Sequence, residues 1–446
     1  MQEAGSPSTT ERHPATPDPF TRARAEASSA ELLHLSRNAT ERVPILDGVR
    51  ASAAVLVFLG HSTILPNDSA ADQFWGRLFT LNGLGAIVFF ILSGFLVTEV
   101  LLKSDRQPRY FFCNFYARRA LRLLPLYYLV VIYGFVIRPQ LQHLGLAQPF
   151  TPTGSIWMYL LGLSNFVVAN RAQWQFFMLD VTWSLSIEFQ FYVVWPIIVY
   201  FLSRRSLLIV AIAMILFGFA YRLLAVYVWD MHPISVYVST FSRIGAFGWG
   251  AMLTLALRDK ELLLRLRPYA TAAAITTLPL IWLVIGFEDA TGRSYQSAYG
   301  IHGGPITFSA LVFLVSIGVC CLIIRILAAT NHGILYRIFC SWPLTHFAKY
   351  SYAFFLLHVP VLTAISGRLY GPPGGKRVPK FLWFEVYGTY IPAQILFYVL
   401  GFICTFILAF LAWHLYEKQW LKLSRFFPSR PPAAKPIPSE PLPRGG

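Results

Sequence analysis

The sequence predicts an all-α fold: a polytopic integral membrane protein with about ten transmembrane helices. Composition is the first observation behind this prediction, because 56% of the 446 residues are hydrophobic and only 13% are charged, whereas a soluble domain is typically about a quarter charged. Patterning is the second observation, because long apolar runs recur from Val43 to Trp420. A spanning helix needs roughly 20 mostly apolar residues.

The two ends of the chain differ in composition from this apolar region. Residues 1–42 are rich in Ser, Thr, Ala, Pro and charge, and residues 426–446 are rich in Pro, compositions typical of disordered segments. No apolar stretch typical of a signal peptide precedes the first long apolar run. We therefore expect one transmembrane domain over residues 43–425, flanked by two disordered tails.

Ten apolar segments are predicted to span the membrane. They cover about 43–65, 83–102, 122–138, 183–202, 206–229, 241–257, 269–288, 306–327, 348–368 and 387–417. An eleventh run, residues 155–168, has about 14 residues, and this length suits an interfacial or re-entrant segment better than a span.

Cationic residues favour ten spans with both termini in the cytoplasm. The net charge is +16, and cytoplasmic loops of membrane proteins carry an excess of Lys and Arg. Ten spans place the cations of 204–205 and 258–267 inside, whereas counting 155–168 as a span would put them outside. The cationic cluster at 376–380 is the one feature against this topology.

Nucleic-acid binding, a disulfide framework and a metal site are not predicted. The positive charge is explained by the membrane topology, so it does not indicate nucleic acid. The five cysteines form no CxxC pair and lie in or near membrane segments, which argues against a disulfide framework. No metal site is predicted either.

The first candidate site residues are Arg50 and His61, within "VRASAAVLVFLGHS". Eleven residues of helix rise about 16 Å in about three full turns, so the two side chains share a face, with Arg50 nearer the cytoplasm. Charged groups inside a span are costly and usually line a pathway or a site. Alternatively, Arg50 pairs with Asp47 and extends to the inner surface, and His61 packs between helices.

The second candidate is the arginine cluster Arg118, Arg119 and Arg122, within "FYARRALRLLPLYYL". Guanidinium groups match phosphate oxygens bidentately, so the cluster suits a polyanionic ligand such as coenzyme A. A basic patch that binds anionic lipid is the alternative.

The third candidate is the helix face of Ser184, Glu188 and Tyr192, within "TWSLSIEFQFYVVWP". Their i, i+4, i+8 spacing places them on one face. A hydrogen-bonded seam between helices is the alternative, although a buried carboxylate is harder to explain that way. Ser351 and His358 also share a face, and we expect His358 to be structural more often than catalytic.

Together these residues resemble the membrane acyltransferase family 3, the group that O-acetylates bacterial surface polysaccharides and some antibiotics. The resemblance covers about 43–425. It rests on Arg50 and His61 in the family's Arg-x10-His pattern, on "VFFILSGFLVT", on "RRALRLLP", on "TWSLSIEFQFY", and on "SYAFFLLHVP" with "YEKQW". Gln419 replaces the proline that usually follows the last Glu-Lys. We expect no esterase-like soluble domain after this region, as in the membrane-only form of the family.

The resemblance implies an O-acetyltransferase of a bacterial cytoplasmic (inner) membrane. It implies acetyl-CoA as donor on the cytoplasmic side and a hydroxyl acceptor, often a glycan or glycoside, at the outer face. On this reading the donor rests on Arg50, Arg118, Arg119 and Arg122. His61, Glu188 and Arg50 are then catalytic, with Glu188 orienting the imidazole, and Trp183, Ser184, Tyr192 and His358 bind the acceptor.

Several alternatives stay open at this stage. His61 acts either as the base of a direct transfer or as a nucleophile that forms an acyl-histidine. The acceptor is not identified, and acetyl is the default acyl group. A transporter or flippase for a glycan or lipid-linked sugar is the competing class, because intramembrane charges suit both. No inverted repeat of the kind found in many transporters is detected.

Overall fold

The structure is a computed structural model, and it describes residues 44–63, 65, 69–79, 82–145, 151–174, 179–290, 305–327, 333–369 and 384–428. Within these ranges the regular structure is helical, apart from an isolated bridge between Val386 and Thr389. Helices satisfy their backbone hydrogen bonds internally, as a bilayer requires. The prediction of an all-α fold is confirmed. The predicted tails, except 426–428, and the cluster at 376–380 lie outside the described residues.

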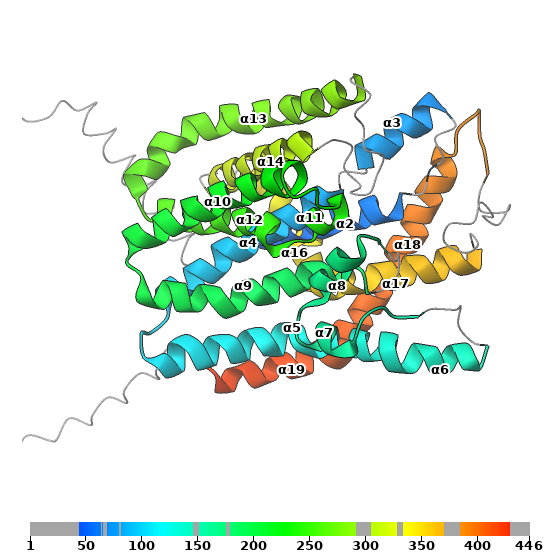
Figure 1. The fold of residues 1–446 in the computed structure, drawn as a ribbon, viewed down its shortest axis with the longest axis horizontal. Helices are drawn as coiled ribbons and strands as arrows, with labels where there is room; N and C mark the ends of the chain where they lie inside the picture. Colours follow the sequence, from blue (N-terminus) through cyan, green and yellow to red (C-terminus); the bar gives the residue numbers. More distant parts are fainter. Residues whose placement is uncertain are drawn as a thin grey trace, which may run out of the picture. The chain divides into compact units, whose positions relative to one another are not determined.

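Ten helices coincide with the ten predicted spans (Figure 1). They are α2 (Pro44–Ser62), α4 (Asn82–Lys103), α5 (Asn114–Ile132), α9 (Thr182–Phe201), α10 (Arg204–Tyr227), α12 (Thr240–Ala256), α13 (Lys260–Ala290), α14 (Pro305–Leu327), α17 (Ser351–Leu369) and α18 (Ile391–Ala412). In the described chain, seven helical segments are long and apolar enough to cross a membrane, and Pro268–Val284 and Ser351–Ile365 are shorter apolar helices. α12 has 17 residues, about 26 Å of helix. A polytopic membrane protein is therefore confirmed, whereas the number of spans and the side of each terminus stay predictions.

Two of these helices continue well beyond their predicted ends. α5 lies within a helical run over Arg109–His143, together with the π-helical turns η1 (Arg109–Cys113) and η2 (Tyr133–Ile137) and α6 (Arg138–His143). α18 continues to Phe426 through η3 (Trp413–Glu417), α19 (Lys418–Lys422) and η4 (Leu423–Phe426). At 35 and 36 residues, both runs are longer than the roughly 20 residues that a span needs. Figure 1 shows α19 beside α5.

The segment 155–168 does not form one helix. It is divided into α7 (Ile156–Leu160) and α8 (Ser164–Arg171). Gly162 lies between them with φ of +69°, a conformation that glycine adopts without the usual Cβ clash. Neither helix is long enough to span a bilayer, as the length of the run predicts. The other short helices are α3 (Ala70–Phe79), α11 (Pro233–Tyr237), α15 (Ile334–Phe339) and α16 (Trp342–Phe347).

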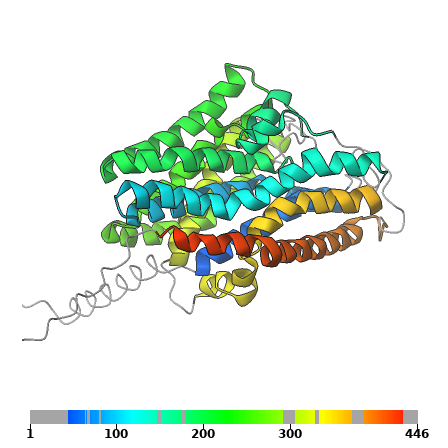
Figure 2. The ribbon, with the colours of Figure 1, turned by 90° about the horizontal axis from the view of Figure 1, so that it is seen from below.

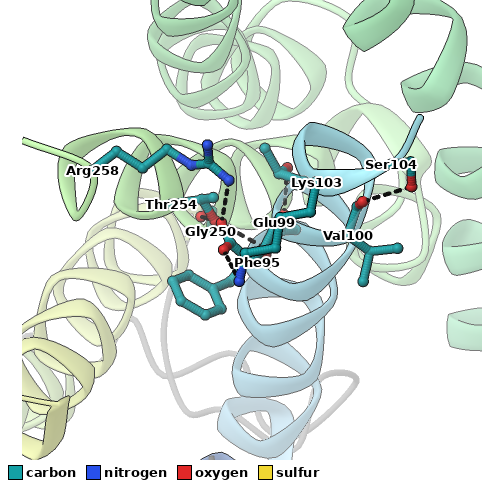
Figure 3. Close-up of polar contacts among 10 residues, drawn as sticks. Phe95, Glu99, Val100, Lys103, Ser104, Gly250, Thr254 and Arg258 are labelled. Atoms are coloured by element: carbon teal, nitrogen blue, oxygen red, sulfur yellow. Dashed lines mark hydrogen bonds and ion pairs between the residues drawn. The ribbon is translucent and has the colours of Figure 1, made fainter. Parts of the chain in front are cut away.

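α4 is held tightly against α12. A Cβ added at Gly94 would meet the Phe247 backbone, and one added at Gly250 would meet the carbonyl oxygen of Ile91, so only glycine permits this approach. Thr254 Oγ1 donates a hydrogen bond to the Phe95 carbonyl at 2.9 Å (Figure 3). One turn further on, Glu99 accepts from Arg258. These contacts set the rotation of α4, and thereby the direction in which its other face points.

α2, α17 and α18 share an aromatic core. The Phe58 ring of α2 lies 5.4 Å from that of Phe354 on α17 and 5.8 Å from that of Phe402 on α18. The rings of Phe354 and Phe402 are 5.2 Å apart. Figure 2 shows α17 and α18 side by side, in gold and orange. This packing brings the last turn of α2 next to the middle of α17, although the two helices are far apart in sequence.

Candidate active site

A cavity of about 70 Å³ lies among α2, α4, α5, α9 and α17. Its polar lining residues are Arg50, Ser93, Arg119, Arg122, Ser184, Glu188, Tyr192, Ser351 and Tyr352. Its apolar lining includes Phe89, Phe90, Leu123 and Phe355. The cavity thus brings together members of all three candidate groups predicted from the sequence, on helices that are separate in the chain.

Three guanidinium groups give one wall of the cavity a positive charge. Arg119 lies over the rings of Tyr192 and Phe115, at 5.2 Å and 5.6 Å from their centroids. Arg122 interacts electrostatically with Arg50 and Arg119. Arg50 also approaches Asp47, with an N···O distance of 3.7 Å. Arg50 therefore both lines the cavity and makes the ion pair with Asp47 that the sequence offered as the alternative. Because three cations line the cavity beside a single carboxylate, the wall suits an anionic ligand.

Arg118 is placed differently from its two neighbours. Its side chain is exposed, and it does not contribute to the lining of the cavity. On a helix, adjacent residues point in directions about 100° apart, whereas 119 and 122 share a face. The sequence cluster is therefore divided: Arg119 and Arg122 face the cavity, and Arg118 faces outward.

Glu188 is the acid of the cavity, and its hydrogen bonds are to hydroxyl groups. Its carboxylate accepts from Ser93 Oγ of α4 and from Tyr192 OH one turn along α9. Ser93 Oγ is also 3.3 Å from Tyr192 OH. Ser184, Glu188 and Tyr192 all line the cavity, so their predicted shared face is confirmed. Ser93 itself was not singled out from the sequence, where a serine in an apolar helix carries little signal.

The expectation that Glu188 orients His61 does not match these contacts. In the described chain, the side chain that hydrogen-bonds to His61 is His358, with His358 Nε2 at 3.2 Å from His61 Nδ1. The two ring centroids are 5.0 Å apart. Neither histidine contributes to the lining of the cavity. The acid and the imidazole therefore belong to two neighbouring parts of the site.

The two histidines are fixed by backbone carbonyl groups. His61 Nδ1 is 3.0 Å from the carbonyl oxygen of Val57, one turn earlier on α2. His358 Nδ1 is 2.5 Å from the carbonyl oxygen of Phe355. His358 is fully buried, whereas His61 is exposed at the end of α2. Of the two histidines, only His61 is therefore exposed at the surface of the helix bundle.

Phe355 connects the cavity with the histidine pair. Its ring lines the cavity beside Phe89, at 5.7 Å between centroids. It also contacts the His358 ring at 5.8 Å. An aromatic layer thus borders the cavity on the side of the imidazoles.

Trp183 lies outside the cavity, in an aromatic cluster at the start of α9. Its ring is 5.2 Å from that of Tyr237 and 6.3 Å from that of Phe90. The guanidinium of Arg243 lies 4.0 Å from the Tyr237 centroid and 5.6 Å from that of Trp183. Trp183 therefore belongs to this aromatic cluster, whereas Ser184, its neighbour in the sequence, lines the cavity.

Glu417 is a further acid that sequence reasoning did not assign. It lies in the π-helical turn η3 and is 5% exposed. It interacts electrostatically with Arg122. The signal in the sequence was its place in "YEKQW", but only the packing of η3 and α19 against α5 brings it to the arginine wall.

The fold and this site together define a polytopic helical membrane protein with a cation-lined cavity and an exposed imidazole at the far end of one helix. The sequence model of one protein family, described as an acyltransferase domain, matches residues 43–414. The chain belongs to this family, the acyltransferase family 3.

Curated relatives support this assignment. The chain is 27% identical to the peptidoglycan O-acetyltransferase OatA of Listeria monocytogenes over 345 residues, which are 74% of this chain and 50% of OatA. It is 25% identical to the O-acetyltransferase OatA of Staphylococcus aureus over 353 residues, covering 73% and 51%. It is 30% identical to the acyltransferase MdmB of Streptomyces mycarofaciens over 169 residues, covering 35% and 39%. The chain thus matches about half the length of the two OatA proteins. No solved structure matches it.

Proposed function

We propose that the protein is a membrane O-acyltransferase that moves an acetyl group from acetyl-CoA to a hydroxyl group of a glycan or glycoside. The observation that carries the proposal is the arrangement along α2. Arg50, near its first turn, lines the cation-rich cavity, and His61, in its last turn, presents an exposed imidazole. Membership of the acyltransferase family 3 supports the reaction class.

The donor binds at the arginine wall. The phosphates of acetyl-CoA are held by Arg50, Arg119 and Arg122, because guanidinium groups make strong charge-assisted hydrogen bonds to phosphate. Glu188, bonded to Ser93 and Tyr192, is the acidic side chain that lines the cavity beside these arginines. The predicted topology places the donor on the cytoplasmic side, where the positive-inside rule puts the arginine-rich ends of the helices.

His61 handles the proton of the reaction. As the acceptor oxygen bonds to the acetyl carbon, the imidazole takes the hydroxyl proton, the C–S bond breaks, and the imidazolium returns the proton to the departing thiolate. In the two-step form, the imidazole nitrogen is acetylated first with release of the thiol, and the acceptor hydroxyl then takes the acetyl group. In both routes the acceptor hydroxyl gives up one proton and coenzyme A leaves as the thiol, and both need an unprotonated ring nitrogen on His61.

The acceptor is proposed to be a cell-wall glycan. OatA of Listeria monocytogenes is named as a peptidoglycan O-acetyltransferase, and by analogy the acceptor of this protein is a glycan hydroxyl presented at the outer face of a bacterial cytoplasmic membrane. The exposed position of His61 at the end of α2 is consistent with an acceptor that arrives from outside the bundle.

Acetyl transfer by the purified protein in lipid vesicles tests the proposal. With radiolabelled acetyl-CoA and peptidoglycan fragments we expect acetylated fragments, and NMR of cell-wall glycans from cells lacking the gene should show lost acetyl signals. If the protein moved a lipid-linked sugar across vesicles and neither consumed acetyl-CoA nor acetylated any acceptor, it would be a transporter or flippase instead.

A further inference from the structure

We propose that His358 is a positioning residue that holds His61 in one tautomer and makes Nε2 of His61 the reacting atom. This inference deepens the proposed function and rests on it for the identity of the reaction. It gives His358 a different role from the acceptor-binding one that the sequence suggested. The hydrogen-bond partners of the two neutral rings determine where their protons lie.

The proton positions follow from the two carbonyl groups. A carbonyl oxygen only accepts, so a ring nitrogen within hydrogen-bond distance of it must carry the proton. His358 Nδ1, at 2.5 Å from the Phe355 carbonyl oxygen, is therefore protonated. In the neutral ring, its Nε2 is then an acceptor.

The proton of the second ring, His61, is fixed in the same way. His61 Nδ1 lies 3.0 Å from the Val57 carbonyl oxygen and 3.2 Å from His358 Nε2, and both of these neighbours are acceptors. A proton on His61 Nδ1 satisfies both in a three-centre hydrogen bond. Nε2 of His61 then carries the lone pair, and among the described residues it has no hydrogen-bond partner.

His358 thus stands where a carboxylate stands in a Ser-His-Asp triad. There the third group holds the imidazole in the correct tautomer and stabilises the imidazolium that forms. A buried neutral imidazole performs both tasks through its lone pair, without placing an anion inside the bundle, where an ion is costly. Glu188 lines the donor cavity and takes no part in this pair of histidines.

Substitutions at His358 test this role because amide side chains mimic one ring nitrogen at a time. His358→Gln reaches the position of Nε2 and can accept from His61, whereas His358→Asn reaches only that of Nδ1 and can donate to Phe355. We expect His358→Asn to lower kcat about tenfold or more, since an orienting hydrogen bond is lost, with an unchanged KM for acetyl-CoA. His358→Gln should recover most of this loss. His414→Gln, at a histidine that approaches Tyr350 instead, is the matched control.

A second readout is independent of activity. NMR spectra of the lipid-reconstituted protein with ¹⁵N-labelled histidine, compared with those of His61→Ala and His358→Asn, should show both rings protonated at Nδ1 and not at Nε2. If no acetyl transfer is found but the spectra show this pattern, the proposed function fails and the assignment of the tautomers stands. If transfer is found but His61 carries its proton on Nε2, or if the Asn and Gln variants behave alike, the positioning role is overturned.

Discussion

At the scale of single residues, Arg50 and His61 lie on one helix but belong to different parts of the site. Arg50 lines the cavity, whereas His61 contacts Val57 and His358. Their losses should therefore differ. We expect His61→Ala to lower turnover about 10²-fold or more while acetyl-CoA still binds. Arg50→Lys keeps the charge but loses the planar fork, so it should mainly weaken donor binding.

Donor affinity by calorimetry and acetyl transfer in detergent measure these two effects separately. His61→Gln keeps a polar side chain without a titrating nitrogen and should also be inactive. If His61→Ala failed to bind the donor while His61→Gln retained full turnover, the imidazole would be structural, and the reacting group would have to be sought near Glu188.

The arginine cluster offers a matched comparison at the same scale. Replacing both Arg119 and Arg122 with Ala should raise the KM for acetyl-CoA, because a hydrogen bond to a charged group typically contributes about 1.5–3 kcal/mol. Arg118→Ala should leave the KM unchanged, since its side chain is exposed and does not line the cavity. An unchanged KM for acetyl-CoA, with loss only of expression, would indicate an anionic-lipid patch instead.

At the scale of helices, the contact between α4 and α12 determines the donor cavity. Ser93, which bonds to Glu188, precedes Gly94, whose Cβ position is filled by the Phe247 backbone. Gly250→Val should therefore force the helices apart, at a cost of about 1–3 kcal/mol or more from overpacking. We expect a lower thermal unfolding temperature in detergent. We also expect acetyl-CoA to raise that temperature less than it does in the unsubstituted protein.

Gly76→Val is the control for this prediction, because a Cβ at Gly76 of α3 meets no atom of the described residues within 4 Å. A valine is tolerated there apart from the change in helix propensity. If Gly76→Val and Gly250→Val lowered the unfolding temperature equally, close packing of α4 and α12 would not be the cause.

At the scale of the whole molecule, the predicted topology rests on the distribution of charge and can be measured directly. Reporter fusions after Arg205 and after Arg430 should both report the cytoplasm, because ten spans leave the intervening cationic loops inside. A fusion after Asp230, between α10 and α11, should report the outside. An external report at Arg205 would reverse the assignment of every later loop.

The positions of the helices and the shared face of α9 could be read from the sequence, because both depend on local patterns. Run length predicts a span, and a helical period predicts that Ser184, Glu188 and Tyr192 point the same way. The division of the arginine cluster into cavity and outward faces follows from the same period. It was not predicted because the sequence does not show which face of α5 meets its neighbours.

Only the tertiary structure decided which side chains meet across helices. Glu188 bonds to Ser93 and not to His61, and His61 pairs with His358, 297 positions later in the chain. Such pairs depend on how each helix is rotated against its neighbours. That rotation is set by close contacts such as those of Gly94 and Gly250 and by the packing of rings such as Phe58 and Phe354. An apolar sequence determines that a helix crosses the bilayer. The partner of a polar group within it is decided when the helices pack together.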